Sequence, residues 1–189
     1  MGLNRLSEAI IEKAKHGDVH AFRIIVEEHQ NFVYSVAFRF VNSTRDAEDI
    51  AQETFLRLWK HMSRYDSGVR LTTWLYKIVT NVSLDHLKST QHRRSSMEVD
   101  LKPTEQMIAA LNADQPLIDE ELRRAVAAAA ESLTPKQKAV FVLRDLEGLD
   151  VSEVSAVLRM SAGSIKSNLC LARKRIAEVL TKYYSHVNG

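Results

Sequence analysis

The stretch from Asp150 to Leu180 constrains the fold most, because it reads as two helices separated by a tight break. Asp150 is followed three residues later by Glu153, the spacing of a capping box at a helix start. After the break at residues 160–163, apolar residues recur at spacings of three or four: Ile165, Leu169, Ala172, Ile176 and Leu180. This period is typical of a helix that buries one face, so the stretch predicts a helix-turn-helix.

The other faces of this second helix carry polar and cationic side chains. Hydroxyl and amide groups can reach base edges, and cations can meet phosphates, as a recognition helix in a major groove requires. The residues that we predict to contact DNA are Ser161, Ser164, Lys166, Ser167, Asn168, Arg173 and Arg175. An amphipathic surface helix with solvated charges is the alternative, but the capped short helix directly before it favours DNA binding.

Composition limits what else the chain can be. With 189 residues and 45% hydrophobic content, it can form one ordinary domain or two small ones. A net charge of +2 means that any basic surface is local, and the single cysteine, Cys170, excludes an internal disulfide. No apolar run predicts a signal peptide or a membrane span, so we expect a cytoplasmic protein.

Helical periodicity runs through most of the chain, and strand-like alternation is absent, so we predict an all-α fold. Between residues 95 and 119 the periodicity fades, two prolines appear and acidic residues dominate. That segment predicts a flexible acidic linker. The expected organisation is therefore a helical domain at 1–94, a linker at 95–119 and a helix-turn-helix domain at 120–189. In the first domain we expect helices from about Leu6 to His16, Asp18 to Asn42, Thr44 to Met62, and Leu71 to Leu87, with Asp18 and Thr44 as caps. In the second we expect a helix that is capped by Thr134 and continues until Glu147-Gly148, and we expect Ser161 to cap the last helix.

The third of these helices has an unusual outward face. Large apolar side chains, Leu56 and Trp59, accompany Asp49, Gln52 and Glu53 on it. An apolar centre with a charged rim indicates a protein-binding surface. Packing of Trp59 on a neighbouring helix explains the same residues and stays open at this point. A dipole-stabilised helix start explains the local acids better than a metal site does.

The fourth helix interleaves aromatic, cationic and amide residues. Trp74 lies on an apolar strip, and a polar face with Tyr76, Lys77, Asn81, Asp85 and Lys88 runs on into Arg93 and Arg94. Rings that stack on bases and cations that follow a backbone suit single-stranded DNA. A bundle helix with a wet face is an equal alternative on these residues alone.

Several motifs together resemble the bacterial RNA polymerase sigma factors of the extracytoplasmic-function (ECF) group. GDVHAF, VYSVAFRF, DAEDIAQETFLRLW and TTWLYKIVTNVSLDHLK resemble the polymerase-binding, DNA-melting and -10-recognition regions of such factors, in their usual order. LTPKQKAVFVLRDLEGLDVSEVSAVLRMSAGSIKSNLCLARKRI resembles their -35-reading domain. The resemblance implies two helical domains and a non-enzymatic specificity subunit that binds core polymerase and promoter DNA and needs no cofactor. It also implies an anti-sigma factor, the partner that commonly holds such factors inactive.

The resemblance also assigns roles to residues. It implies core-polymerase binding, mainly to the clamp helices of the largest subunit, by Asp49, Gln52, Glu53, Leu56 and Trp59. For -10 recognition and melting it implies Tyr65, Arg70, Trp74, Lys77, Asn81, Asp85, Lys88, Arg93 and Arg94. Departures from the family pattern include Lys88 for an arginine, Arg159 where the turn usually has glycine, and Asn168, Cys170 and Leu171 in a recognition helix that is less basic than usual. These departures predict an unusual -35 preference.

Other classes of function fit the sequence less well. A dimeric repressor or activator would use the helix-turn-helix but leaves the face around Trp59 unexplained. An enzyme would need a paired ligand motif, a nucleophile elbow or a phosphate-binding glycine loop, and we find none of these; we predict no catalytic residue and no metal site. A purely protein-binding adaptor does not explain the basic last helix.

Overall fold

The computed structural model describes residues 8–96, 126 and 129–187, with side chains described for 8–90, 126 and 129–181. Within these ranges the secondary structure is helical, without strands. The elements are α1 (Glu8–Lys15), α2 (Val19–Val41), α3 (Thr44–His61), η1 (Met62–Arg64), α4 (Leu71–Ser96), α6 (Pro135–Phe141), η3 (Val142–Leu146), α7 (Val151–Leu158) and α8 (Ala162–Val187). The prediction of an all-α fold with two helical domains is confirmed.

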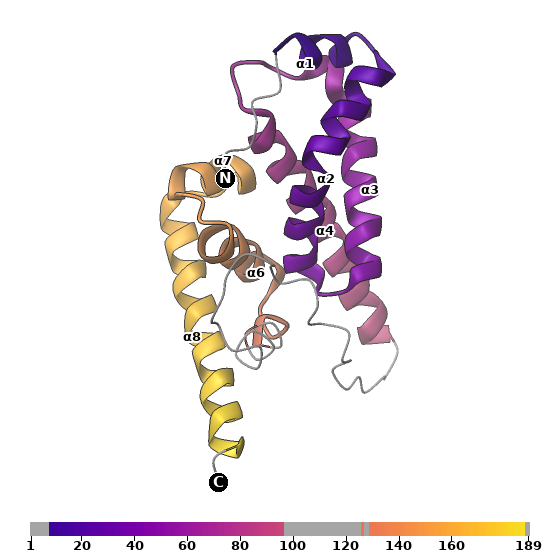
Figure 1. Ribbon diagram of the computed structural model, residues 1–189. Coiled ribbons are helices and arrows are strands. Elements are labelled where there is room, and N and C mark those ends of the chain that lie inside the picture. The colour runs from indigo at the N-terminus through magenta and orange to yellow at the C-terminus, as the bar shows by residue number, and fades with distance from the viewer. Residues whose placement is uncertain (1–7, 97–125, 127–128, 188–189) are drawn as a thin grey trace.

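The first domain is a bundle in which α2, α3 and α4 pack along one another and α1 crosses one end (Figure 1). Its core includes Ile25, Phe40, Leu58 and Leu75, each fully buried. Asp18 caps the start of α2, as predicted, and its carboxylate accepts a hydrogen bond from the Ala21 amide. The predicted cap of α3 was wrong by one residue, because Ser43 rather than Thr44 accepts from the Asp46 amide.

Helix α4 is longer than predicted. It continues past Leu87 to Ser96, two residues beyond the predicted end of the first domain. Residues 88–96 contain neither glycine nor proline, so nothing local stops the helix where the apolar pattern fades. The rest of the predicted linker, residues 97–119, lies outside the described residues.

The second domain is built from α6, η3, α7 and α8, which enclose Phe141, Leu143, Val154 and Ile165. Thr134 and Gln137 form the capping box of α6, with Pro135 as its first residue. The predicted continuous helix up to Leu146 is interrupted, because η3 is a π-helical turn. Such turns are rare, and they occur frequently at functional sites.

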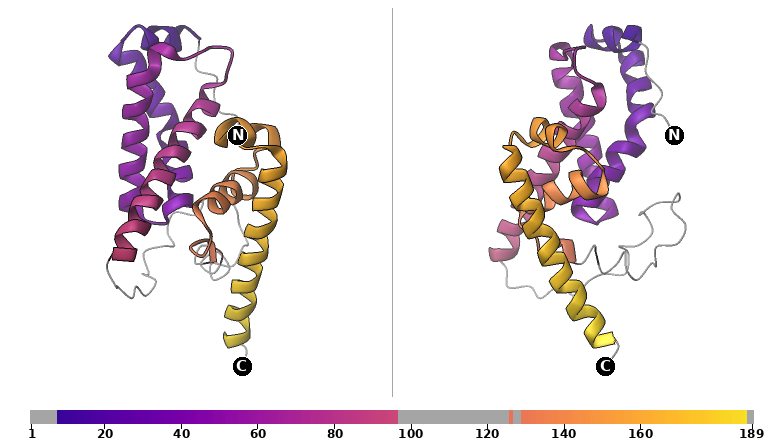
Figure 2. Two further views of the ribbon diagram at one scale, coloured as in Figure 1. Left: turned by 180° about the vertical axis from the view of Figure 1, so that it is seen from behind. Right: turned by 90° about the vertical axis from the view of Figure 1, so that its left-hand side faces the viewer.

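The two domains pack side by side in all the views (Figures 1 and 2). Ala139 and Val142 of the second domain join the apolar core of the first, and α7 contacts α4. In the part of the chain that the structure describes, no helix has the length and apolar character needed to cross a membrane.

Two leucines of α3 allow a direct test of this packing. Leu58 is fully buried and Leu56 is 59% exposed, although they are two residues apart on one helix. We expect Leu58→Ala to lower the free energy of unfolding by about 2–5 kcal/mol, because it leaves a cavity in the core. Leu56→Ala is expected to change it by less than about 0.5 kcal/mol. Urea denaturation followed by circular dichroism measures both, and equal losses would contradict the described packing.

Candidate nucleic-acid and protein interfaces

The outward face of α3 holds the predicted protein-binding residues together. Asp49, Gln52, Leu56 and Trp59 are exposed, and Glu53 is half-buried. The Trp59 ring also packs on Phe22 of α2, with centroids 4.7 Å apart and planes tilted by 58°. Trp59 remains 37% exposed, so it packs internally and still contributes to the surface. The packing interpretation therefore holds, and contact with Phe22 fixes the orientation of the ring. The role of Trp59 in protein binding stays a prediction.

Arg57 connects this face to α4. Its Nε donates to Glu53 at 2.7 Å, and an NH group donates to Asp85 of α4 at 3.5 Å. The hydrogen bond to Glu53 is the main reason that the pKa of Arg57 is raised above its ordinary value. Glu53 and Asp85, predicted for two different sites, thus share one cation. Substituting either acid would disturb both surfaces, so neither is a clean probe.

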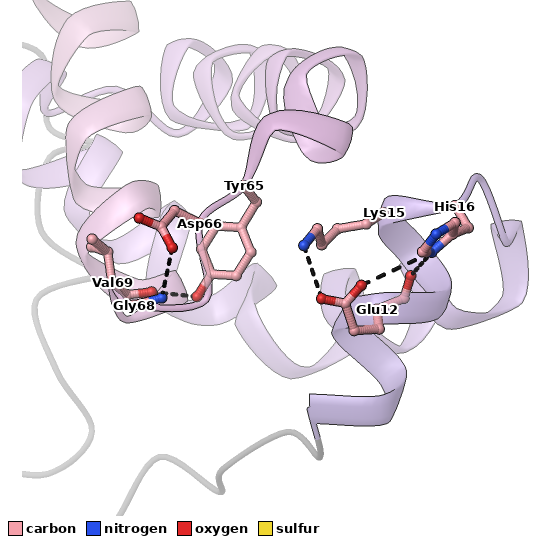
Figure 3. Close-up of polar contacts among 7 residues, drawn as sticks. All are labelled: Glu12, Lys15, His16, Tyr65, Asp66, Gly68 and Val69. Atoms are coloured by element: carbon pink, nitrogen blue, oxygen red, sulfur yellow. Dashed lines mark hydrogen bonds and ion pairs between the residues drawn. The ribbon is translucent and has the colours of Figure 1, made fainter.

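The loop between η1 and α4 is anchored from inside. Tyr65 is only 5% exposed, and its hydroxyl donates to the Val69 carbonyl, while Asp66 accepts from the Gly68 amide at 2.9 Å (Figure 3). The Trp74 ring meets Tyr65 edge-on, with centroids 5.3 Å apart. Burial raises the pKa of Tyr65. Tyr65 therefore shapes the loop that presents the exposed Arg70, rather than offering its own ring at the surface.

Helix α1 lies beside this loop, and its surface is held by local ion pairs (Figure 3). Glu12 pairs with Lys15 at 2.8 Å and approaches His16 at 3.9 Å. The hydrogen bond from Lys15 lowers the pKa of Glu12. These ion pairs lie on the surface of α1 and are not part of the predicted sites.

The polar face of α4 is accessible along its middle. Asn81, Asp85 and Lys88 are exposed on one side, whereas Trp74 and Lys77 are half-buried. Arg93 and Arg94 lie in the helical part of α4, but their side chains are outside the described residues. The predicted -10 residues are therefore divided between an open polar face and a more enclosed segment at the helix start.

Tyr76 does not belong to that polar face, contrary to the prediction. Its ring meets Phe32 edge-on at 4.8 Å, and its hydroxyl donates to Glu147 of the second domain at 3.0 Å. Arg39 of α2 pairs with the same carboxylate and donates to the Leu146 carbonyl at 3.2 Å. Burial and the Glu147 charge raise the pKa of Tyr76. We call Arg39, Tyr76 and Glu147 the interdomain cluster; sequence alone gave no signal for it.

The helix-turn-helix has the predicted caps. Asp150 accepts from the Glu153 amide at 2.8 Å, and Glu153 accepts from the Asp150 amide at 2.7 Å. In the turn, Arg159 takes the left-handed conformation, with φ of 54°, where glycine would be easier. Ser161 accepts from the Ser164 amide at 3.3 Å and so caps α8, as predicted.

Helix α8 divides into a buried and an exposed side. Ile165, Ala172 and Ile176 are buried, as predicted. Of the predicted -35 residues, Ser161, Lys166, Ser167, Arg173 and Arg175 are exposed.

Two side chains of α8 are already engaged within the domain. Asn168 is half-buried and donates to the Ser164 carbonyl at 2.8 Å. Arg173 makes two hydrogen bonds to Asp145, at 2.8 and 2.6 Å. The exposed side of α8 also includes Cys170 and Leu171, which the prediction did not assign to DNA.

Among the described residues, no group of three or more His, Cys, Asp or Glu side chains is arranged to hold a metal ion. The arrangement is instead one of surfaces: an apolar and acidic face on α3, a polar face on α4, and a cationic outer side on α8. These features define a two-domain helical protein of the helix-turn-helix class.

Comparison with known proteins identifies the family. The model of Sigma-70 region 2 matches residues 25–93, and that of Sigma-70, region 4 matches residues 123–176. The ECF RNA polymerase sigma factor SigE of Mycolicibacterium smegmatis is 32% identical over 85% of this chain, which spans 62% of that relative's length. The ECF RNA polymerase sigma-E factor of Escherichia coli K12 is 29% identical over 89% of this chain and 91% of its own.

Solved structures share the fold. The sigma factor RpoE, in complex with the anti-sigma factor NepR from Bartonella quintana, matches with a TM-score of 0.67 and 21% identity over 86% of this chain and 98% of that one. CnrH, in complex with the cytosolic domain of CnrY, matches with a TM-score of 0.65 and 22% identity over 92% and 96%.

The chain belongs to the sigma-70 family, in its extracytoplasmic-function group. It is thus a specificity subunit of RNA polymerase, and its function is promoter-specific initiation of transcription.

Proposed function

We propose that this factor binds core RNA polymerase through the outward face of α3 and reads promoter DNA with α4 and α8. The observation that supports this most is that one chain carries all three surfaces, within segments that match two sigma regions in order. On α3, Leu56 and Trp59 form the apolar centre, and Asp49, Gln52 and Glu53 form the rim. The partner is the pair of clamp helices in the largest polymerase subunit.

The first domain reads the -10 element and holds it open. Asn81, Asp85 and Lys88 form the accessible face, and the other contributors are Tyr65, Arg70, Trp74, Lys77, Arg93 and Arg94. Tyr65 acts through the shape of its loop, since its ring is buried. Unstacking a base costs a few kcal/mol, and stacking a base on a protein side chain contributes about 1–3 kcal/mol. Contacts with a few unstacked bases can therefore offset the free energy of melting.

The second domain holds the -35 duplex. Helix α8 enters the major groove, with Ser161, Ser164, Ser167 and Asn168 near base edges. Lys166, Arg173 and Arg175 lie where they can meet phosphates. Because the chain's net charge is only +2, the basic surface is local and its affinity for DNA is modest. The polymerase supplies much of the remaining affinity for the promoter.

The domain limits that we propose are 1–94, 95–119 and 120–189. The factor has no catalytic site of its own and needs no cofactor or metal; nucleotide transfer belongs to the polymerase. An anti-sigma factor holds it inactive, since the solved sigma factor from Bartonella quintana is bound to one. We place it in the cytoplasm, with polymerase on the nucleoid.

Run-off transcription with purified core polymerase and a genomic DNA library tests this function. We expect discrete start sites only when the chain is added, with core polymerase alone as the control. Asn81→Ala should reduce initiation on duplex promoters. Initiation by this variant should recover on templates whose -10 region is already melted, because the factor then does not have to open the duplex. Absence of chain-dependent start sites would overturn the proposal.

A further inference from the structure

Leu171 is a large apolar side chain on the exposed side of the recognition helix. It lies in the first half of α8 and is 53% exposed. Ser167, four residues earlier, and Lys174, three residues later, are its neighbours on the same helical face, and both are exposed. Leu171 therefore lies on the surface that α8 turns away from its own domain.

Two polar side chains of the predicted -35 surface are already engaged within the domain. The Asn168 amide already donates to the Ser164 carbonyl, and the Arg173 guanidinium is held by Asp145 through two hydrogen bonds. Leu171 has no polar atom to satisfy and projects from the same helix. An exposed leucine is common on protein surfaces and needs no explanation by itself. The position of Leu171 decides which groups of the DNA it can contact when α8 lies in a major groove.

We propose that Leu171 recognises thymine in the -35 element through van der Waals contact with the C5-methyl group. This inference rests on the proposed function, because it requires α8 to lie in a major groove. Among the four bases only thymine presents a methyl group there, and an apolar side chain is its natural partner. The contact selects an A·T pair at one position, without a hydrogen bond.

The surroundings of Leu171 favour DNA over a protein partner. Lys174 and Arg175, three and four residues later on α8, are exposed beside it. This arrangement differs from the α3 face, where acids surround two large apolar residues. An isolated apolar side chain beside cations complements a groove lined by phosphates, in which the methyl group is the apolar feature.

Uracil substitution gives a test that removes only the methyl group. Holoenzyme assembled from core polymerase and the full chain is first used to select a -35 sequence from duplexes randomised in that region. Each thymine of the selected sequence is then replaced in turn by uracil, and binding is measured by competition. We expect one position at which uracil weakens wild-type binding about fourfold, the effect expected for one buried methyl-sized group.

In Leu171→Ala the same uracil substitution should have no effect, and selection should lose its preference for thymine at that position. Leu171→Ile should retain both responses, since it keeps an apolar side chain of equal size. Lys174→Ala is the control: it should weaken binding to all sequences and leave the uracil response intact.

The outcomes separate the two proposals. If no sequence is selected, -35 reading itself fails and Leu171 has no such role. If a sequence is selected but no thymine responds to uracil, or Leu171→Ala still responds, the methyl contact is wrong while promoter reading stands.

Discussion

Replacing Leu56 by alanine is expected to weaken the binding of core RNA polymerase by roughly 10- to 30-fold, as loss of a central interface residue commonly does. Leu56 is 59% exposed at the centre of the α3 face, so little of its side chain supports the fold. The full chain and purified core enzyme, titrated by fluorescence anisotropy, give the dissociation constant. Undiminished binding would show that the α3 face does not form the interface with core polymerase.

The matched control is an exposed apolar residue on another helix. Ile24 of α2 is 43% exposed, and Ile24→Ala should leave polymerase binding unchanged. Trp59→Ala is a poorer probe, because that ring also packs on Phe22 and its removal loosens α2 against α3. Circular dichroism on each variant confirms that a loss of binding is not a loss of fold.

Glu147→Gln is expected to separate the two domains. The Glu147 and Arg39 side chains are only 7% and 16% exposed, and neutralising one partner of a buried pair leaves the other uncompensated. That costs about 3 kcal/mol, a shift of roughly a hundredfold between docked and separated domains. Glutamine preserves the size of the side chain, so each domain should stay folded.

The chain contains its own probes for this separation. Both tryptophans, Trp59 and Trp74, are in the first domain, and the single cysteine, Cys170, is exposed in the second. Energy transfer from tryptophan to a dye on Cys170 should fall in Glu147→Gln. Glu27→Gln breaks an exposed pair with Arg23 and should leave transfer unchanged. Equal transfer in all three proteins would mean that the cluster does not hold the domains together.

Local signals predicted most of the fold. Short-range patterns predict where a helix begins and which of its faces is buried. They predict the caps at Asp18, Thr134, Asp150 and Ser161 and the buried stripes of α3 and α8. The same patterns predicted that Leu56 would be exposed. Such features need no knowledge of what lies across the molecule.

Contacts between residues far apart in the chain could not be predicted from local sequence patterns. The pattern of α4 groups Tyr76 with polar residues, yet its partner is Glu147, 71 residues away. Glu147 directly follows a π-helical turn that no periodicity indicates. The end of α4 was missed because a fading apolar stripe does not stop a helix. At the -35 surface, side chains were predicted by type, but hydrogen bonds within the domain decide which of them remain available.

The interdomain cluster also has a consequence for occupancy of promoters. Elements at -35 and -10 are about 25 base pairs apart, or about 85 Å along the DNA axis, whereas a compact chain of this length is about 40 Å across. Only the fraction of molecules with separated domains can bridge them, and each 1.4 kcal/mol of docking lowers the apparent affinity tenfold. If the two domains read these two elements as proposed, docking through Arg39, Tyr76 and Glu147 lowers the affinity of the free factor for promoter DNA. Binding to the polymerase must then supply the free energy that separates the domains.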